Sequence, residues 1–183
     1  MIQIRLHGRG GQGTVTAAEL LASAAFDDGH EAQAFPAFGV ERRGAPVQAF
    51  CRISEQPIRN RSQIYQPDIV VVQDTTLVGV VDVTAGLKAG GILLINTERT
   101  PQELGLNGDF RVIAVPATKI ALEILGRPIT NTALMGAFAA ASGAISMAAI
   151  ERNIKSRFRG ELGEKNVVCA KRAYDLVKER EAK

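Results

Sequence analysis

One stretch near the N-terminus decides how the rest of the chain is interpreted: Leu6-His7-Gly8-Arg9-Gly10-Gly11-Gln12-Gly13-Thr14. In front of it, Ile2 and Ile4 alternate with polar residues, and this period of two is typical of a β-strand. Behind it, apolar residues recur at helical spacing as far as Ala25. The glycines are therefore predicted to form a turn between a strand and a helix, and Gly29 is expected to end that helix.

This turn has the composition of an anion-binding site. Gly8, Gly10 and Gly13 satisfy the pattern G-x-G-x-x-G. Glycine lets a ligand approach the backbone closely, and the following helix offers unpaired N–H groups and the positive end of its dipole. The candidate contacts for an anion such as a pyrophosphate are Gly8, Gly10, Gly11, Gln12, Gly13 and Thr14. The alternative is a tight turn that packs the helix against the strand and binds no ligand.

A second short strand is expected from His30 to Phe35. In a dinucleotide-binding unit, an acidic residue about twenty positions after the glycines binds the ribose hydroxyls. Here the chain reads Ala34-Phe35-Pro36-Ala37-Phe38 at that point. The missing acid argues against NAD as the ligand.

The next loop carries two adjacent arginines, Arg42 and Arg43, followed by Gly44. An arginine side chain presents a planar fork of donors that suits a phosphate or a carboxylate. The loop returns from the end of the second strand, so we expect it at the same sheet edge as the glycine turn. Arg42, Arg43 and Gly44 are therefore further candidate contacts. The alternative is that Glu41 pairs with one arginine while the other is solvated.

Three apolar runs predict the centre of the sheet: Ile69–Val72, Ile92–Ile95 and Val112–Val115. Such runs are typical of parallel strands that are buried on both faces. A helix is expected from Val78 to Leu87, preceded by Asp74 as its N-cap or as a site residue. The alternation of strands and helices predicts an α/β fold, with a doubly wound, mostly parallel sheet and helices on both faces.

From Ala117 onward the chain is predicted to be helical. The stretch from Thr132 to Ile150 holds no charged residue, but it is dominated by small residues, and Gly143 and Ser146 predict a break into two helices. A membrane span is therefore not favoured over a buried, closely packed helix. A final amphipathic helix is expected around residues 167–177.

The length and charge of the chain limit the class of protein. Its 183 residues suit a single α/β domain, with a core sheet over about 1–116 and a helical part over about 117–183. From residue 151 onward, ten Lys or Arg residues are interspersed with six Asp or Glu residues. No aromatic stacking platform accompanies them, so a solvated helix face is favoured over nucleic-acid binding. Since the first residues read as a strand and not as a signal segment, we expect a cytoplasmic protein.

Few residues of the chain could carry out chemistry. Cys51 and Cys169 lie far apart and outside any C-x-x-C pattern, so they cannot by themselves supply a zinc site or an iron–sulfur cluster. His7 and His30 lack companions at the spacing of metal ligands. An enzyme that acts alone should show a nucleophile with a base, a carboxylate pair or a metal cluster, and none can be pointed to. We infer a subunit whose site is completed by other polypeptides.

Several segments together resemble one known family. They are His7–Gly13, Gln33–Pro36, Phe38–Phe50, Pro67–Val72 and Asn131–Ala137. In combination these segments are similar to the gamma subunit of 2-oxoacid:ferredoxin oxidoreductases, and most closely to the pyruvate synthase type. The similarity covers essentially the whole chain.

The resemblance implies a Rossmann-like domain that takes part in oxidative decarboxylation dependent on thiamine diphosphate. A 2-oxoacid and coenzyme A give acyl-CoA and carbon dioxide, and two electrons pass to ferredoxin, or the reaction runs in reverse. The implied partners are alpha, beta and delta-type subunits, which hold the thiamine diphosphate and the 4Fe-4S clusters. This chain is then expected to bind no cofactor tightly, to contain no catalytic residue and to be inactive alone.

On this basis we expect the glycine turn and the loop of Arg42, Arg43 and Gly44 to face the entry of coenzyme A. Three alternatives stay open. The chain could be a stand-alone protein that binds NAD or another nucleotide, a structural scaffold, or the same subunit in a complex specific for 2-oxoisovalerate.

Overall fold

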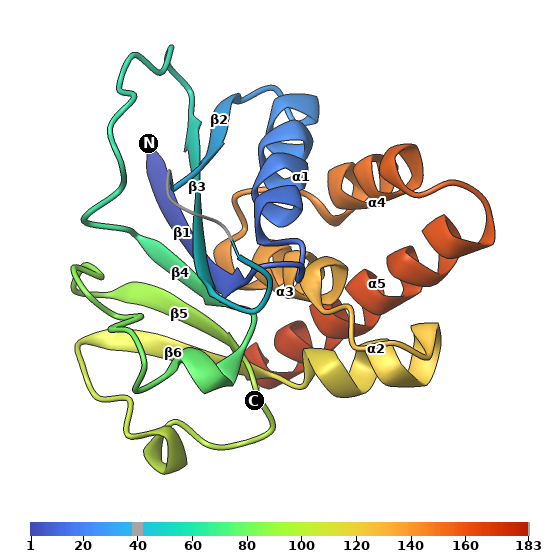
Figure 1. Cartoon of the computed structure of the whole chain (residues 1–183). Coiled ribbons are helices and arrows are strands. Elements are labelled where there is room, and N and C mark those ends of the chain that lie inside the picture. The colour runs from blue at the N-terminus through green and yellow to red at the C-terminus, as the bar shows by residue number, and fades with distance from the viewer. Residues whose placement is uncertain (38–41, 183) are drawn as a thin grey trace.

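The computed structural model describes residues 1–37 and 42–182, and these form a six-stranded sheet with helices (Figure 1). The strands are β1 (Ile2–Arg9), β2 (Glu31–Pro36), β3 (Pro46–Ser54), β4 (Ile69–Val72), β5 (Gly91–Asn96) and β6 (Phe110–Val115). Their order across the sheet is β2-β3-β1-β4-β5-β6.

Among these strands, β3 alone runs against the others. The pairs β1–β4, β4–β5 and β5–β6 are parallel, whereas β3 is antiparallel to both β1 and β2. It follows that β2 runs in the same direction as β1. The predicted α/β fold with a mostly parallel sheet is confirmed. The carboxyl ends of five strands lie together at one edge, which we call the carboxyl edge.

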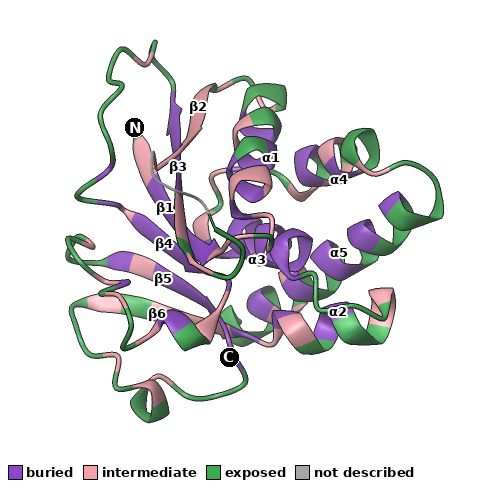
Figure 2. Ribbon diagram, viewed as in Figure 1, coloured by how far each residue is buried: buried purple, intermediate pink, exposed green. Residues whose placement is uncertain are grey.

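Five α-helices pack on one face of the sheet (Figure 1). They are α1 (Thr14–Asp27), α2 (Ala117–Leu125), α3 (Asn131–Ser142), α4 (Met147–Arg157) and α5 (Glu161–Glu181). Apolar residues of all five share a core with Ile4, Leu6 and Leu94 of the sheet. In Figure 2 the buried residues, in purple, lie along the strands and on the helices that cover them. The predicted helical C-terminal third is confirmed.

The uncharged stretch forms the most deeply buried helix, α3, which packs against α5. All residues from Asn131 to Ala141 are buried. At Gly136 a Cβ atom would overlap the carbonyl oxygen of Ala170 on α5, so only glycine permits this close approach. The predicted break is also confirmed, because α3 ends before Gly143 and Ser146 caps α4. No helix within the described residues is long and apolar enough to cross a membrane.

The opposite face of the sheet is covered by connecting segments. A second apolar cluster there contains Val70, Val72, Leu93 and Ile95 of the sheet, packed beneath Leu77 and Val83. These connections contain two short 3-10 helices, η1 (Thr75–Leu77) and η2 (Gln102–Leu104). The prediction of helices on both faces therefore needs correction: in the described chain the α-helices lie on one face.

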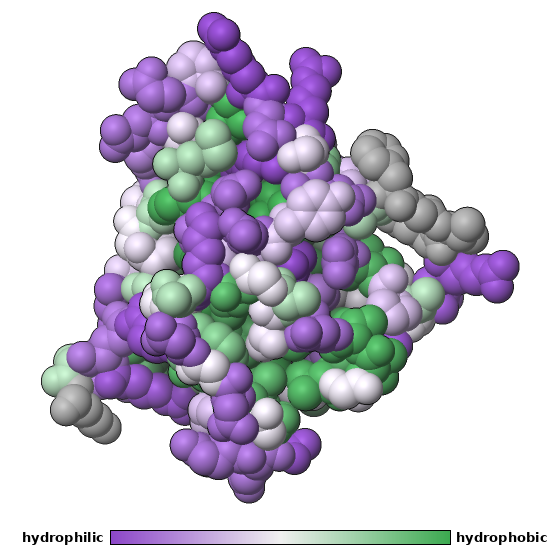
Figure 3. Space-filling view, turned by 90° about the vertical axis from the view of Figure 1, so that its left-hand side faces the viewer, coloured by the Kyte–Doolittle hydropathy of each residue, from purple (hydrophilic) through white to green (hydrophobic). Residues whose placement is uncertain are grey.

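The predicted helix from Val78 to Leu87 is wrong, because turns occupy this segment. Gly79 and Gly86 have φ angles of +86° and +69°, which do not fit a right-handed helix. Between them, the carboxylate of Asp82 accepts hydrogen bonds from the N–H and the hydroxyl of Thr84, a local bond that competes with a helix. Figure 3 views the side where this segment and the neighbouring connections lie, and hydrophilic residues alternate there with apolar ones.

Candidate functional site

The glycine turn connects β1 to α1 at the carboxyl edge, as predicted. A Cβ atom at Gly8 would overlap the hydroxyl oxygen of Thr14, and one at Gly10 would overlap the carbonyl oxygen of Arg42. Gly13 stands just before α1 with a φ of +74°, a left-handed conformation that favours glycine. The packing of the chain itself therefore accounts for these three glycines, whatever else the turn does.

The N-terminus of α1 follows directly on the glycine turn. No side chain caps it, and its first backbone bond runs from the N–H of Ala17 to the carbonyl of Gly13. Thr14 does not act as a cap, because its buried hydroxyl donates to Oε1 of Gln73 at 2.7 Å. The first turn of the helix thus presents backbone N–H groups and a positive dipole end, which together favour an anion.

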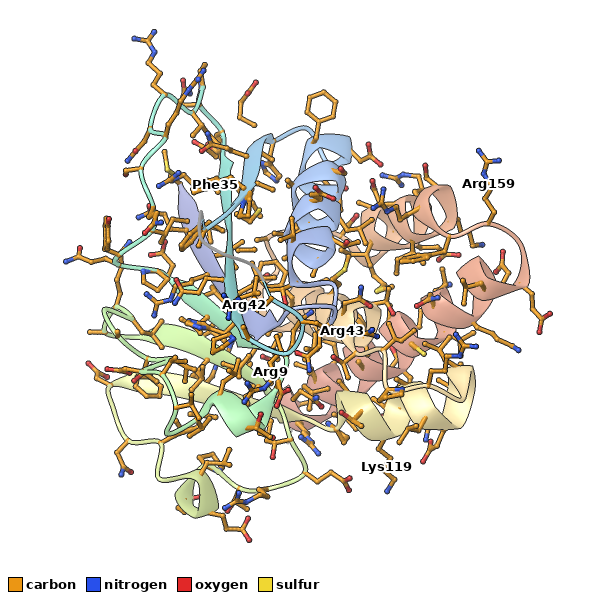
Figure 4. The ribbon with its side chains drawn as sticks, in the orientation of Figure 1. Arg9, Phe35, Arg42, Arg43, Lys119 and Arg159 are labelled. Carbon is orange, nitrogen blue, oxygen red and sulfur yellow. The ribbon has the colours of Figure 1, made fainter. Side chains whose placement is uncertain are left out.

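The arginine loop, which we define as residues Arg42–Ala45, lies directly beside the glycine turn. Gly10 donates its N–H to the carbonyl of Ala45 at 2.9 Å, and Gly44 donates to the carbonyl of Gly10 at 3.1 Å. The expectation that both segments share one sheet edge is confirmed. Arg42 and Arg43 are exposed, and Figure 4 shows them at this end of the sheet together with Arg9. Glu41, the alternative partner for an arginine, lies outside the described residues.

Arg43 is the arginine that the backbone brings closest to the turn. Its backbone forms an isolated bridge with Gly10. Its side chain extends over Gly11, where an added Cβ atom would lie 3.9 Å from Cγ and 4.0 Å from Nε of Arg43. Neither Arg43 nor Arg42 forms an ion pair with a carboxylate of the described residues. The positive charges of these two arginines are therefore available next to the glycine turn.

Arg9 ties the turn to its neighbours, a role that the sequence did not indicate. Its guanidinium donates to the carbonyl of Gly44 at 3.0 Å and to the hydroxyl of Thr76 at 2.7 Å, and it lies 3.4 Å from a carboxylate oxygen of Asp74. Gln12 completes the connection: its side chain accepts from the N–H of Arg9 at 2.8 Å and donates to Asp74 at 2.7 Å. Gln12 therefore holds the turn in shape from within.

Asp74 is the carboxylate at the centre of this network. Its oxygen accepts from the N–H of Thr76, so it caps η1, and the expected N-cap role is confirmed, although for a 3-10 helix. Burial by itself raises the pKa of Asp74, but hydrogen bonds from Thr76 and Gln12 and the charge of Arg9 outweigh burial and lower that pKa below its usual value. Asp74 is thus ionised at neutral pH and neutralises Arg9.

Two buried amide side chains next to the turn were also not predicted from the sequence. Asn131, 4% exposed, begins α3, and its Nδ2 lies 2.9 Å from where a Cβ atom on Gly13 would stand. Gln73, 2% exposed, has an Nε2 atom without a hydrogen-bond partner in the described chain. Both line a small internal cavity of about 10 Å³. The N-termini of α1 and α3 therefore converge on one place, but the segments involved lie more than a hundred residues apart in the sequence.

The end of β2, where a dinucleotide-binding unit would carry its ribose-binding acid, holds an aromatic residue and a proline instead. β2 ends at Pro36, and the ring of Phe35 lies 5.2 Å from the ring of Phe50 and 5.2 Å from the guanidinium of Arg52 (Figure 4). No carboxylate of the described strand end faces the glycine turn.

The histidine of the glycine motif is a buried structural group. His7 is 1% exposed, and its Nε2 accepts a hydrogen bond from Nε of Arg5 at 2.9 Å. Burial, together with the charge of Arg5, lowers the pKa of His7 to about 3, so the imidazole is neutral at physiological pH. Its partner Arg5 donates to the carbonyls of Val83 and Ala85, so the two side chains lie on the face that the connecting segments cover.

The cysteines do not fit an iron–sulfur cluster. Cys51 lies on β3 and Cys169 on α5, and both are buried. Burial raises the pKa of Cys51 to about 12 and that of Cys169 to about 11, which disfavours the thiolate that binds metals. No cluster of three or more His, Cys, Asp or Glu side chains among the described residues could hold a metal ion. The fold and the site thus define an α/β protein whose described residues place an uncapped helix N-terminus and exposed arginines at the carboxyl edge of the sheet.

Comparison with known proteins identifies the family. The chain matches the family described as pyruvate ferredoxin/flavodoxin oxidoreductase over residues 3–176. It is 57% identical over 182 residues to pyruvate synthase subunit PorC of Methanosarcina barkeri, covering 100% of both chains. It is 58% identical over 178 residues to the pyruvate/ketoisovalerate oxidoreductases common subunit gamma of Pyrococcus furiosus, covering 96% of each.

A solved structure agrees with these relatives. The pyruvate oxidoreductase subunit PORC of Thermotoga maritima superposes with a TM-score of 0.83 at 37% identity, covering 95% of each chain. The chain therefore belongs to the pyruvate ferredoxin/flavodoxin oxidoreductase family, as a gamma-type subunit. The resemblance noted in the sequence is confirmed.

Proposed function

We propose that this chain is the gamma subunit of a cytoplasmic, multi-subunit pyruvate:ferredoxin oxidoreductase. The complex oxidatively decarboxylates a 2-oxoacid with coenzyme A, giving acyl-CoA, carbon dioxide and reduced ferredoxin. The chain acts as one domain alongside alpha, beta and delta-type subunits and is inactive alone. Support comes from full-length relatives that are named as such subunits. A complex specific for 2-oxoisovalerate is the nearest alternative, since one relative serves both enzymes by its name.

In this proposal the other subunits hold the thiamine diphosphate and the 4Fe-4S clusters. Thiamine diphosphate would supply the electron sink for decarboxylation, and the clusters would carry the electrons to ferredoxin. The two buried cysteines of this chain, on separate elements and with raised pKa values, support the placement of the clusters elsewhere.

The carboxyl edge of the chain would contact the phosphates of coenzyme A. The observation that carries this step is the arrangement of Arg43 over the glycine turn, beside the open first turn of α1. A phosphate placed there would accept hydrogen bonds from backbone N–H groups near Gly11, Gly13 and Thr14 and from the guanidinium of Arg43. Gly8, Gly10 and Gln12 would hold the turn in shape, while Gly44 and Arg42 would position the loop.

Substitution of Arg43 in the assembled enzyme tests the site. In the complex that contains Arg43→Ala, we expect the KM for coenzyme A to rise about tenfold, because a charge-assisted hydrogen bond is worth about 1.5–3 kcal/mol. The KM for the 2-oxoacid and the kcat at saturating coenzyme A should change little. Arg159→Ala is the matched control, since Arg159 is an exposed arginine in the connection between α4 and α5, away from the turn (Figure 4).

The result is judged on complexes of normal size and subunit content. A KM for coenzyme A that equals that of the Arg159→Ala control would overturn the assignment of Arg43. If the purified chain instead bound NAD tightly by calorimetry without partners, the stand-alone nucleotide-binding alternative would replace the subunit proposal.

A further inference from the structure

The sheet has an open edge at β6 that borders a cleft away from the glycine turn. The cleft has a volume of about 640 Å³. Its base is formed by Val112, Ile113 and Ala114 of β6, and its walls come from residues 97–101, the start of α2 and the end of α5. In the described chain β6 pairs with β5 on one side and with no strand on the other.

The backbone of β6 presents unpaired groups to this cleft. Val115 accepts from the N–H of Thr97 at 2.8 Å, so the odd-numbered residues of β6 direct their backbone groups toward β5. Successive residues of a strand alternate in this respect, so Phe110, Val112 and Ala114 point outward. The carbonyl of Ala114 accepts a bond from Arg180 at 2.6 Å, which agrees with this direction. No hydrogen bond within the described residues uses the N–H of Phe110 or Val112.

The rim of the cleft carries more basic than acidic side chains, with Arg99, Arg111, Lys119 and Arg180 against Glu98 and Glu181. Arg180 bonds to a backbone carbonyl, and so does Arg99, whose guanidinium donates to the carbonyl of Glu103. Lys119 lies 4.0 Å from Glu98, and both side chains are more than half exposed, so this pair contributes little. Among the basic residues of the rim, Arg111 has a close carboxylate partner, Glu181 at 2.8 Å.

The apolar base, the unpaired backbone groups of β6 and the basic rim together favour one kind of ligand in the cleft. Open backbone groups along a strand edge pair with an extended peptide, in which main-chain bonds supply affinity. An apolar base accommodates alternate side chains of that peptide, and guanidinium groups held by carbonyls favour carboxylates. A small anion would use the charge but would leave the row of backbone groups unpaired.

We propose that β6 is a docking edge on which an extended, acidic segment of another subunit adds a seventh strand to the sheet. This inference rests on the proposed function, because the complex supplies the segment. Arg99 and Arg180 contact its acidic side chains, and the outward N–H groups of Phe110 and Val112 donate to its carbonyls.

Amide hydrogen exchange at single-residue resolution tests the proposal, with the free chain compared with the purified complex. We expect exchange at Phe110, Val112 and Ala114 to slow at least about tenfold on assembly, because these amides gain partners. The amides of Arg111, Ile113 and Val115 bond to β5 in both states and serve as internal controls. Unchanged exchange at the outward amides within an intact complex would overturn the proposal, and a cleft filled by a small anion would give that same result.

A pair of variants at one position provides a second test. Val112→Pro removes the outward N–H, and an edge position tolerates proline when that N–H is unbonded within the chain. Val112→Ala keeps the N–H and serves as the matched control. In competition with wild-type chain for assembly, Val112→Pro should be at least about tenfold weaker than Val112→Ala, about 1.4 kcal/mol. Equal incorporation of the two variants would contradict the docking edge.

Charge variants test whether the segment that docks on β6 is acidic or neutral. Arg99→Gln and Arg180→Gln should weaken assembly and reduce its dependence on salt, whereas Arg159→Gln should do neither. An absence of any complex for the wild-type chain, judged by its size in solution with the other subunits present, would overturn the proposed function and, with it, the source of this segment.

Discussion

The glycine turn and the arginine loop lie side by side at the carboxyl edge, but different forces hold them. In the turn, Gly8, Gly10 and Gln12 are engaged in contacts with the chain's own backbone and side chains. In the loop, the side chains of Arg42 and Arg43 are exposed, and the loop is fixed through backbone bonds and through Arg9. A glycine pattern typical of ligand binding is thus explained first by packing within the chain. In the proposed function, the groups that bind the anion come from the neighbouring loop and from the helix start.

The largest expected effect on stability comes from the turn. Gly10→Ala places a Cβ atom against the carbonyl of Arg42 and should lower the free energy of unfolding by about 2–3 kcal/mol, as overpacking does. Gly44→Ala is the matched control in the loop. Gly44 has a φ of +79° with nothing near its Cβ position, so the substitution should cost about 1 kcal/mol from backbone strain alone. Urea unfolding measures both, and equal losses would remove the distinction between turn and loop.

The next effect concerns β1, the strand that leads into the turn. The folded-state pKa of His7 is about 3, against about 6.5 when unfolded, so protonation favours the unfolded chain as the pH falls below about 6.5. Between pH 7 and pH 5, wild type should lose about 2 kcal/mol more stability than His7→Gln, which stays neutral. Parallel pH profiles for the two proteins would show that this part of the acid sensitivity arises elsewhere.

A smaller effect is expected at the junction between turn and loop. Asp74→Asn removes the charge that pairs with Arg9 and should cost about 1 kcal/mol at pH 7. Because the folded-state pKa of Asp74 is lowered, its contribution is fully present above about pH 4 and is lost as the pH falls through that pKa. The stabilities of wild type and Asp74→Asn, measured by thermal unfolding, should therefore converge in acid. A constant difference down to pH 2 would contradict the ion pair.

The smallest effect is predicted for Arg43. Since its side chain is exposed and forms no ion pair with a described carboxylate, Arg43→Ala should change the free energy of unfolding by less than about 0.5 kcal/mol. Denaturant unfolding of the isolated chain measures this value. A loss above 1 kcal/mol would mean that the loop depends on Arg43 for its structure, and the turn and the loop would then no longer differ.

The strands and the helical C-terminal third could be predicted because their patterns are local. The runs Ile69–Val72 and Ile92–Ile95 are apolar throughout and match β4 and most of β5. The break at Gly143 and Ser146 follows from capping chemistry that a few neighbouring residues determine. By contrast, the segment from Val78 to Leu87 combines apolar residues with two glycines in left-handed conformation, and periodicity alone did not separate these turns from a helix.

The site could be predicted only in part, for a related reason. The placement of the arginine loop beside the turn followed from strand order, which the patterns imply. The bond from Thr14 to Gln73 spans 59 positions, and the approach of Asn131 to Gly13 spans twice that separation. Such contacts depend on the folded arrangement of β4 and α3, so no local sequence pattern predicts them. Arg9, in contrast, stood within the quoted stretch, and its charge could have been considered.

In the proposed function, coenzyme A places a phosphate between Arg43 and the first turn of α1. A structure of the assembled enzyme with coenzyme A bound tests it most directly. We expect a phosphate oxygen within about 3.2 Å of the Arg43 guanidinium and of a backbone N–H at the start of α1, the range of such hydrogen bonds. Coenzyme A with its phosphates remote from both the glycine turn and the arginine loop would contradict the claim.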